Sequence, residues 1–270
     1  MKERNTVVDI TGRTKLFAII GDPVRQVKTP EVINALLRER GFDGVMVAIH
    51  VAPDALSAVL HGMKHMQNLG GLIITVPHKT QAIALCDDVT TRAQLVGAVN
   101  CIRREPSGAL TGTIFDGTGF IEGLRGHGIE PRGMATFIVG AGGAANAIAF
   151  ALAEVGVLRI SIVNRTAKKA DDLAARLRAR YPALQIDTQM AVPTGHDLVI
   201  NTTSLGLSPG DPLPIDPALL EPSQIIAEII MQPELTPLLV AAGVRGCRVH
   251  PGRPMLDAQI DLMAAYFGIP

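Results

Sequence analysis

The sequence predicts an α/β fold in two domains, and three observations support that prediction. Short apolar runs of strand length alternate with longer segments of helical period along nearly all 270 residues. Hydrophobic residues make up 47% and charged residues 19%, which is enough apolar side chain for one large core or two modest ones. The alternation starts afresh near Gly117, so two successive α/β units share the chain.

Strand–helix order of this kind is typical of a mostly parallel sheet with helices on its faces. The predicted strands are 16–20, 46–51, 72–76, 136–139, 160–163, 198–200, 225–230 and 248–249. The predicted helices are 31–40, 53–66, one that ends over 120–126, 144–154, 167–180 and 255–267. We expect the domain boundary near 113–117, and we expect 208–214, which is rich in proline and glycine, to be a surface loop.

Charge and cysteine content exclude several classes of protein. Lys plus Arg and Asp plus Glu are 25 each, so no general electrostatic attraction to nucleic acid or an anionic membrane is expected. Cys86, Cys101 and Cys247 are far apart and odd in number, which favours free thiols in a reducing compartment. Residues 1–5 begin no secretion signal, 144–163 is interrupted by charges, and the histidines form no metal spacing. We expect a cytoplasmic protein without a metal.

The strongest local signal is a G-x-G-x-x-A pattern that follows one predicted strand and opens the next helix. Gly140 permits the tight turn, Gly142 lets the backbone approach a pyrophosphate, and Ala145 is small enough for the helix to pack on the strand. The helix N-terminus offers N–H groups and a partial positive charge to the phosphates. The pattern predicts a dinucleotide site with candidate contacts at Gly140, Ala141, Gly142, Gly143 and Ala144.

The end of the following strand indicates which dinucleotide is bound. An NAD site places a carboxylate there for the ribose hydroxyls, whereas this strand is followed by Asn164, Arg165 and Thr166. The Arg165 guanidinium can grip a 2′-phosphate, which favours NADP. An exposed arginine at a helix start is the alternative, and Lys168 and Lys169 are more typical of a solvated helix face.

Polar clusters in the first half lie at strand ends or in loops, and loops that follow parallel strands face the ligand crevice of an open sheet. They are 21–30, 75–79, 97–100 and, at the expected boundary, 116–117. A lysine and an aspartate beside a nicotinamide suit alcohol oxidation, because one of them takes the hydroxyl proton as hydride leaves carbon. By itself Lys79 is an ordinary surface lysine, and His78 next to it is more typical of packing.

Together these motifs resemble the shikimate/quinate dehydrogenase family over nearly the whole chain and in the family's order. The matching segments are Gly21-Asp22-Pro23, Val27-Lys28-Thr29-Pro30, Thr75-Val76-Pro77-His78-Lys79, Gly97-Ala98-Val99-Asn100, Asp116-Gly117, the glycine loop, Asn164-Arg165-Thr166, Thr236-Pro237-Leu238-Leu239, and Gly252 with Met255-Leu256 and Gln259. So many ordered matches are specific for the family and less specific for the substrate.

The resemblance implies reversible NADP-dependent oxidation of a cyclic hydroxy acid, with Lys79 and Asp116 as the catalytic pair. It implies that Ile229 and Gly252 lie along the nicotinamide half of the cofactor and that the last helix returns to the first domain. The implied domains are a substrate domain over 1–115 and 253–270 and a Rossmann-type domain over 116–252. The implied substrate side comprises Val27, Thr29, Thr75, Asn100, Asp116, Met231 and Gln259.

Several positions depart from the family pattern where the resemblance places the substrate. The first serine of a serine-x-serine pair is Val27, and losing a hydroxyl that binds a carboxylate costs about 1.5–3 kcal/mol. Arg25 in the same loop either replaces that hydroxyl by an ion pair or is an exposed arginine. We expect the chemistry to be kept and substrate recognition to be altered. The other departures are Ile73 for an asparagine, Phe115 in a stretch that is commonly D-N-T-D, Met231 for a tyrosine and Glu228 for an aspartate.

Three functions remain open at this point. The first is an NADP-dependent dehydrogenase acting on shikimate or a related hydroxy acid, as a monomer or homodimer and without nucleic acid or membrane. The second is an oxidoreductase of another substrate class that resembles methylenetetrahydrofolate dehydrogenases, against which Asp116-Gly117 and Gln259 argue. The third is a non-catalytic NADPH-binding regulator, which has no need to keep both Lys79 and Asp116.

Overall fold

The computed structural model describes residues 10–270, which form two compact units. Unit 1 comprises the described residues up to Gln94, Ala98–Ile114 and Ile260–Pro270, and unit 2 comprises Leu95–Gly97 and Phe115–Gln259. Residues 1–5, on which the expected lack of a secretion signal rests, lie outside the described residues. Compactness does not test independent folding, so the domain limits stay a prediction.

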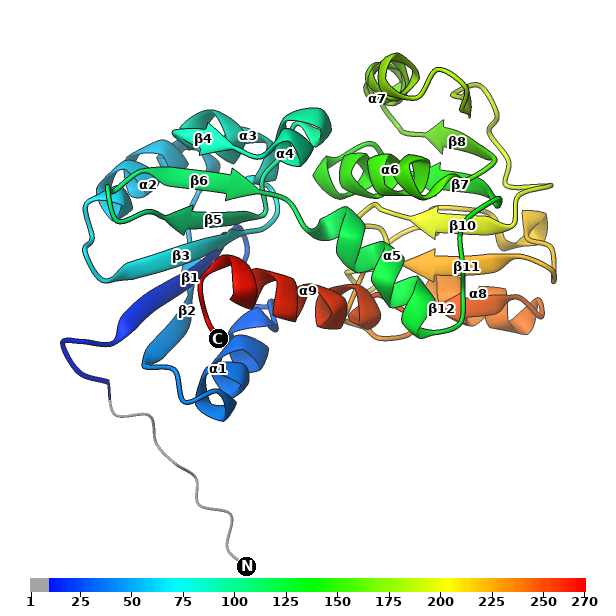
Figure 1. The fold of residues 1–270 in the computed structure, drawn as a ribbon. Helices are drawn as coiled ribbons and strands as arrows, with labels where there is room; N and C mark the ends of the chain where they lie inside the picture. The colour runs from blue at the N-terminus through cyan, green and yellow to red at the C-terminus, as the bar shows by residue number, and fades with distance from the viewer. Residues whose placement is uncertain (1–9) are drawn as a thin grey trace, which may run out of the picture. The chain divides into compact units, whose positions relative to one another are not determined.

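Unit 1 contains a six-stranded mixed sheet in the order β2-β1-β3-β5-β6-β4 (Figure 1). Strands β1, β2 and β3 are parallel, and β5 runs antiparallel to both β3 and β6. The strands are β1 Lys15–Gly21, β2 Gly44–His50, β3 Leu69–Ile74, β4 Asp88–Val89, β5 Cys101–Arg104 and β6 Leu110–Thr113. The helices are α1 Thr29–Glu39, α2 Leu56–Lys64, α3 Lys79–Ala82 and α4 Thr91–Val96, with 3-10 turns at Pro53–Ala55 and Ile83–Leu85.

Strand β3 lies earlier than the sequence predicts, and two glycines explain the shift. The prediction placed the strand at 72–76, because Gly70 and Gly71 are poor strand formers. In the fold they make room for aromatic rings: a Cβ on Gly70 would overlap the Phe17 ring, and a Cβ on Gly71 would overlap the Phe267 ring. Phe17 and Phe267 lie 5.2 Å apart between ring centroids, so the end of the chain packs on this sheet, as predicted.

Unit 2 contains a six-stranded sheet in the order β12-β11-β10-β7-β8-β9, with every pair parallel. Relative to the chain this is the order 6-5-4-1-2-3, which defines a doubly wound Rossmann sheet with its switch point between β7 and β10. The strands are β7 Ala135–Val139, β8 Arg159–Val163, β9 Gln185–Asp187, β10 Leu198–Asn201, β11 Ile225–Glu228 and β12 Arg248–His250. The helices are α5 Asp116–Gly126, α6 Gly143–Val155, α7 Ala167–Arg180 and α8 Pro237–Val244, with a 3-10 turn at Pro217–Leu219. Helix α9, Arg253–Tyr266, belongs to unit 2 up to Gln259 and to unit 1 from Ile260.

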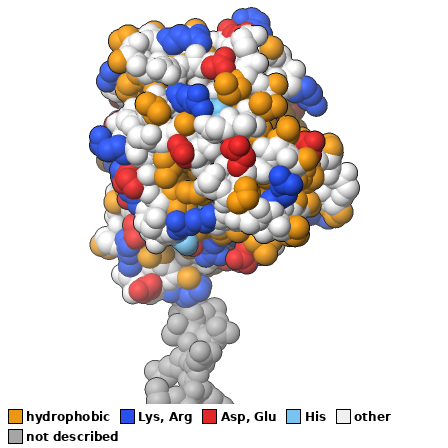
Figure 2. All heavy atoms as spheres, turned by 90° about the vertical axis from the view of Figure 1, so that its right-hand side faces the viewer, with side chains coloured by type: hydrophobic (Ala, Val, Ile, Leu, Met, Phe, Trp, Pro, Cys, Tyr) orange, Lys and Arg blue, Asp and Glu red, His pale blue; other side chains and the backbone are white. Residues whose placement is uncertain are grey.

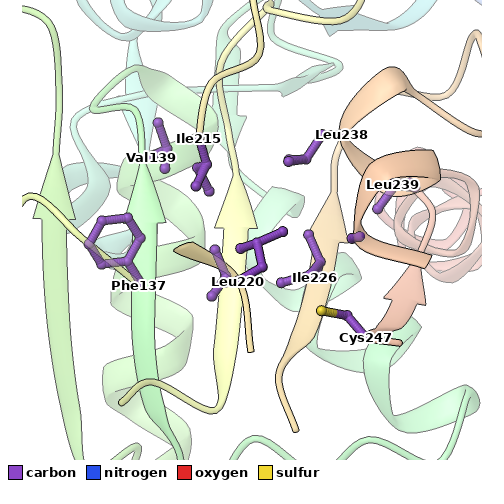
Figure 3. Close-up of a cluster of buried hydrophobic side chains, with 10 residues drawn as sticks. Phe137, Val139, Ile215, Leu220, Ile226, Leu238, Leu239 and Cys247 are labelled. Carbon is purple, nitrogen blue, oxygen red and sulfur yellow. The ribbon is translucent and has the colours of Figure 1, made fainter. Parts of the chain in front are cut away.

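Part of the core of unit 2 lies beside β11 and α8, where side chains from β7, β11 and the loop residues Ile215 and Leu220 pack together (Figure 3). The surface carries both signs of charge, and Figure 2 shows acidic, basic and hydrophobic side chains interspersed on one face. Among the described residues, no helix is long and apolar enough to cross a bilayer.

Several elements were not predicted from the sequence. Helix α8 is apolar almost throughout, so it shows no helical periodicity, and the short strands β4, β5, β6 and β9 carry too few alternating residues to stand out. Helix α5 begins at Asp116, although only its end was recognised. Asp116, at the expected domain boundary, is therefore the first residue of a helix.

Candidate functional site

The predicted dinucleotide loop of unit 2 joins the fully buried strand β7 to helix α6. Gly140 has a φ of +115°, a backbone region that L side chains rarely adopt, and its N–H donates to the Val163 carbonyl at 2.8 Å. A Cβ at this position would overlap the Thr202 hydroxyl, which itself donates to the Val139 carbonyl at 2.6 Å. The turn therefore requires glycine at residue 140.

The N-terminus of α6 has the features of a phosphate site. Gly142 is exposed and extended, and no side chain caps the first turn of the helix. The first N–H groups of a helix lack intrahelical acceptors, so an uncapped turn leaves them for a ligand. A Cβ on Gly142 would meet nothing within 4 Å, so the space in front of this residue is open. Ala145 is fully buried, as the predicted packing of helix on strand requires. The loop thus fits a dinucleotide.

A pocket of about 430 Å³ lies beside this loop at the carboxyl ends of β7, β8 and β10. It includes Asn164 and Arg165, and among the described residues that line it none is acidic. The Asn164 side chain donates to the Thr166 carbonyl at 2.9 Å, which fixes the turn that holds Arg165 in an exposed position. Lys168 pairs with the exposed Asp172 at 3.0 Å, as expected for a solvated helix face. The lining residues are Val139, Gly140, Val163, Asn164, Arg165, Thr203, Ser204, Leu205 and Pro214.

The opposite wall of the pocket was missed by the sequence analysis. It is formed by Thr203, Ser204 and Leu205, which follow β10, and by Pro214. A signal for this wall was present in the sequence: the polar run 201–203 directly follows the apolar run 198–200. Polar residues at the end of a buried parallel strand indicate a ligand site. The sequence predicts only a surface loop over 208–214, and Pro214 of that loop lines the pocket.

The segment after β11 brings together the residues assigned by resemblance to the nicotinamide half. A Cβ on Gly252 would overlap the backbone of Ile229 and Ile230, so glycine allows the two chain segments to touch. Ile229 and Met231 are half-buried on either side of the buried Ile230.

Asp116 and Gln259 are placed by close helix packing. Asp116 begins α5 and is only 3% exposed. A Cβ on Gly117 would overlap the Ala147 carbonyl of α6, and a Cβ on Gly119 would overlap the Gln259 side chain of α9. Gln259 therefore lies beside the first turn of α5, the turn that Asp116 begins. Its own amide donates to the Met255 carbonyl at 3.1 Å.

In unit 1, the loops after β1 and β3 are joined by backbone hydrogen bonds. The Thr75 N–H donates to the Ile20 carbonyl at 2.9 Å, and the Asp22 N–H donates to the Val76 carbonyl at 3.0 Å. Asp22 also pairs with His50, at the end of β2, at 2.5 Å. The G-x-P and T-V-P motifs, far apart in sequence, are therefore parts of one local structure.

Lys79 and Asn100 belong to the same group of segments. Lys79 is the first residue of α3, and its carbonyl accepts from the Val99 N–H at 2.9 Å. The Asn100 carbonyl accepts from the Ile74 N–H at 2.8 Å, directly before Thr75. Unit 1 thus holds Thr75, Lys79 and Asn100 on segments that are joined by backbone hydrogen bonds. His78 is fully buried with its Nε2 2.8 Å from the Val51 carbonyl, so its role is packing.

The loop between β1 and α1 carries the most evident departure from the family. Val27 is half-buried, and Thr29 is a buried residue that begins α1. Lys28 pairs with Glu31 at 3.2 Å, whereas Arg25 is exposed. The half-buried aliphatic side chain of Val27 thus lies two residues before the buried Thr29.

Two buried ionisable groups of unit 2 have shifted pKa values. Burial raises the pKa of Glu228 to about 6, against hydrogen bonds from Asn201 and Thr236 that lower it. Burial, followed by the nearby His127 and Arg248, lowers the pKa of His250 to about 4. Among the described residues, no cluster of three or more His, Cys, Asp or Glu side chains is arranged to hold a metal.

The fold and the pocket define a two-unit α/β protein with a Rossmann-type unit. The model of the shikimate dehydrogenase substrate binding domain matches residues 19–102, and the model of shikimate/quinate 5-dehydrogenase matches residues 130–206. A relative from Acidiphilium cryptum named shikimate dehydrogenase (NADP(+)) is 36% identical over 96% of this chain and 93% of its own length. This chain belongs to the shikimate/quinate dehydrogenase family.

Solved structures with the same fold include several members of the family. Shikimate dehydrogenase from Aquifex aeolicus superposes with a TM-score of 0.87 at 31% identity, covering 96% of this chain and 94% of its own. The enzyme from Thermus thermophilus, in complex with NADP(H) and shikimate, has a TM-score of 0.83 at 30% identity, covering 94% and 93%. A 5-ketofructose reductase from Gluconobacter has a TM-score of 0.83 at 32% identity, covering 95% and 94%.

Proposed function

We propose that the protein is an NADP-dependent dehydrogenase that reversibly transfers a hydride between NADP(H) and a hydroxyl of shikimate or a related cyclic hydroxy acid. The observation that carries the proposal is the pocket of unit 2, which is lined by Gly140 of the glycine loop and by Arg165 and has no carboxylate among its described lining residues. The same loop leads into the uncapped N-terminus of α6. Two relatives that this chain matches over more than nine-tenths of their length are named shikimate dehydrogenase (NADP(+)), which supports the same assignment.

We assign the cofactor to groups that the structure holds in unit 2. The backbone of Gly140–Ala144 would bind the pyrophosphate, because its N–H groups are uncapped. Asn164, Arg165 and Thr166 would hold the 2′-phosphate, with the guanidinium supplying the charge. Ile229 and Gly252 would border the nicotinamide half. When bound, NADP supplies the hydride acceptor.

We assign the proton transfer to Lys79 and Asp116. In oxidation, the substrate O–H bond breaks, its proton passes to the Lys79 amine, and the carbonyl forms as hydride leaves carbon; in reduction the Lys79 ammonium returns the proton. Asp116 would hold the same hydroxyl through its carboxylate. Support comes from each unit by itself: Lys79 follows the rigid 75–77 loop, and Asp116 is a buried residue at a helix start.

On the substrate side we assign Val27, Thr29, Thr75, Asn100, Met231 and Gln259. Val27 and Met231 are half-buried where the family usually has hydroxyl groups, so the protein offers a carboxylate fewer charge-assisted hydrogen bonds. We therefore infer weak binding of shikimate and a preference within the family for a less polar or differently substituted acid.

A second candidate is reduction of a neutral keto sugar. The solved 5-ketofructose reductase shares 32% identity and the fold with this chain, so the family includes enzymes named for such a substrate. Val27 suits a substrate without a carboxylate.

We also place the protein in the cytoplasm, because its three cysteines are free thiols, and propose that it acts as a monomer or homodimer.

The test is steady-state kinetics with NADP and NAD on a panel of shikimate, quinate and neutral polyols. We expect turnover of at least one acid with NADP, and we expect Arg165→Ala to raise the KM for NADP about 10–100-fold while use of NAD hardly changes. Lys168→Ala is the matched control, since it removes one nearby positive charge that is paired with Asp172. Equal use of both cofactors by the wild type would contradict the assignment.

A further inference from the structure

A buried carboxyl group lies behind the pocket wall at the ends of β10 and β11. Asn201 and Glu228 are the last residues of these strands, lie opposite each other in register, and are both fully buried. The Glu228 Oε1 accepts from the Asn201 Nδ2 at 2.9 Å and from the Thr236 Oγ1 at 3.0 Å. Thr236, also fully buried, caps α8. The Glu228 side chain thus connects the end of β11 to the end of β10 and to the start of α8.

Asn201 connects Glu228 to the wall of the pocket. Its Oδ1 accepts from both the N–H and the hydroxyl of Thr203, at 3.0 and 2.7 Å, and its Nδ2 donates to the Leu205 carbonyl at 3.1 Å. An amide turned the other way would direct its NH₂ at the Thr203 N–H and its oxygen at the Glu228 carboxyl group. The acceptor at Glu228 and the donors at Thr203 therefore select one orientation of the Asn201 side-chain amide. In that orientation the amide bonds to both Thr203 and Leu205, the two ends of the 203–205 turn.

We propose that Glu228 is a positioning residue for cofactor binding: through Asn201 it holds residues 203–205 in the form that walls the pocket beside the glycine loop. Glu228 does not line the pocket itself, so it acts only through its neighbours. The proposal rests on the proposed function for the identity of the ligand, NADP(H).

Only one oxygen of Glu228 takes part in this arrangement. Its Oε2 is buried without a geometrically formed hydrogen bond among the described residues; burial raises the pKa of the carboxyl group, whereas Asn201, Thr236 and the nearby backbone N–H groups of Ile230 and Ile229 lower it. An acceptor at Oε1 is therefore what the turn needs, and a negative charge is not. Glutamine supplies that acceptor in the same place, whereas methionine has similar length and no comparable acceptor.

The experiment measures the Kd for NADPH by fluorescence titration, together with the Tm, for wild type, Glu228→Gln and Glu228→Met. We expect Glu228→Met to raise the Kd about tenfold, the factor for one lost interaction of about 1.4 kcal/mol, and Glu228→Gln to stay within about twofold of wild type. The matched control is Gln224→Met just before the other end of β11, where the buried amide donates to the Pro193 and His196 carbonyls. That control should lower the Tm and leave the Kd unchanged.

Asn201→Ala tests whether Glu228 acts through Asn201. It should raise the Kd as Glu228→Met does, and the double variant should be no worse than either single one, since both break the same connection. An unchanged Kd in Glu228→Met or Asn201→Ala, or a Kd raised more than fivefold in Glu228→Gln at native Tm, would overturn the proposal. Should Glu228→Met fail to fold, the Kd values of Asn201→Ala and Glu228→Gln test the proposal by the same criteria. A wild type that does not bind NADPH would instead contradict the proposed function.

Discussion

The loop after β7 in unit 2 and the loop after β3 in unit 1 follow buried parallel strands, yet they present different chemistry. The first consists of glycine and alanine, offers backbone N–H groups, and has no side-chain cap. The second carries Thr75 and Lys79 on a backbone fixed by hydrogen bonds to β1 and to Val99. In the proposed function, one loop binds the cofactor through its main chain, and the other acts on the substrate through its side chains.

This difference explains which features of the family the chain retains. A main-chain site depends on turn geometry, so a change at Gly140 disturbs the fold as well as the ligand. A side-chain site on a fixed backbone can change one residue at a time, as Val27 in the neighbouring loop illustrates. We therefore expect cofactor binding to be retained and substrate recognition to have diverged.

The largest effect is expected at the side-chain site. Lys79→Ala should lower kcat about 10²–10⁴-fold, the usual loss for a missing acid–base group, because the substrate hydroxyl no longer has its proton acceptor. NADPH binding, measured by fluorescence titration, should be unchanged. Lys64→Ala, another lysine of unit 1 paired with Asp87, is the control and should retain kcat. Normal turnover in Lys79→Ala would remove the lysine from the mechanism.

The next effect concerns the response of unit 2 to acid, because two of its buried groups have shifted pKa values. The pKa of His250 is lowered to about 4 in the folded protein, so below pH 6.5 the unfolded chain takes up the proton first and stability is lost as pH falls toward 4. Between pH 7 and 5 this amounts to about 2 kcal/mol. Glu228 acts in the opposite direction: its raised pKa, about 6, costs stability above about pH 4.5, so acid recovers part of it.

Urea unfolding of wild type and His250→Phe at pH 7 and 5 isolates the histidine, because the contribution of Glu228 cancels in the difference. The variant should lose less stability than wild type between the two pH values. Equal losses would show that His250 titrates normally in the folded protein.

A pair of glycine variants tests the main-chain site at a smaller scale. Gly142→Ala should keep the wild-type Tm, because its Cβ meets nothing, and should raise the Kd for NADPH about tenfold by filling the space for the phosphates. Gly140→Ala should lower the stability of unit 2 by about 1–3 kcal/mol, because of the positive φ and the overlap with Thr202. Thermal unfolding and fluorescence titration separate the two, and an unaltered Kd in Gly142→Ala would argue against a phosphate site.

The parts of the molecule that follow periodic rules were predictable from the sequence. The two α/β units, the glycine turn and the absence of a carboxylate after β8 were found because each depends on local spacing. Strand β3 was displaced because Gly70 and Gly71 are explained only by the rings of Phe17 and Phe267, the latter nearly 200 residues away in sequence. The Asn201–Glu228–Thr236 connection was missed for the same reason, since it depends on strand register. The assignments of individual site residues stay predictions.

The most direct test of the account is the kinetics of shikimate oxidation with NADP by wild type and Val27→Ser. Because the wild type has Val27 in place of one of the two hydroxyls of the family's serine-x-serine pair, we expect a KM for shikimate well above about 1 mM. Val27→Ser should raise kcat/KM about tenfold for acids and leave a carboxamide analogue unaffected, as one charge-assisted hydrogen bond allows. A micromolar KM in the wild type would contradict the account, because recognition of the carboxylate would then be intact despite Val27.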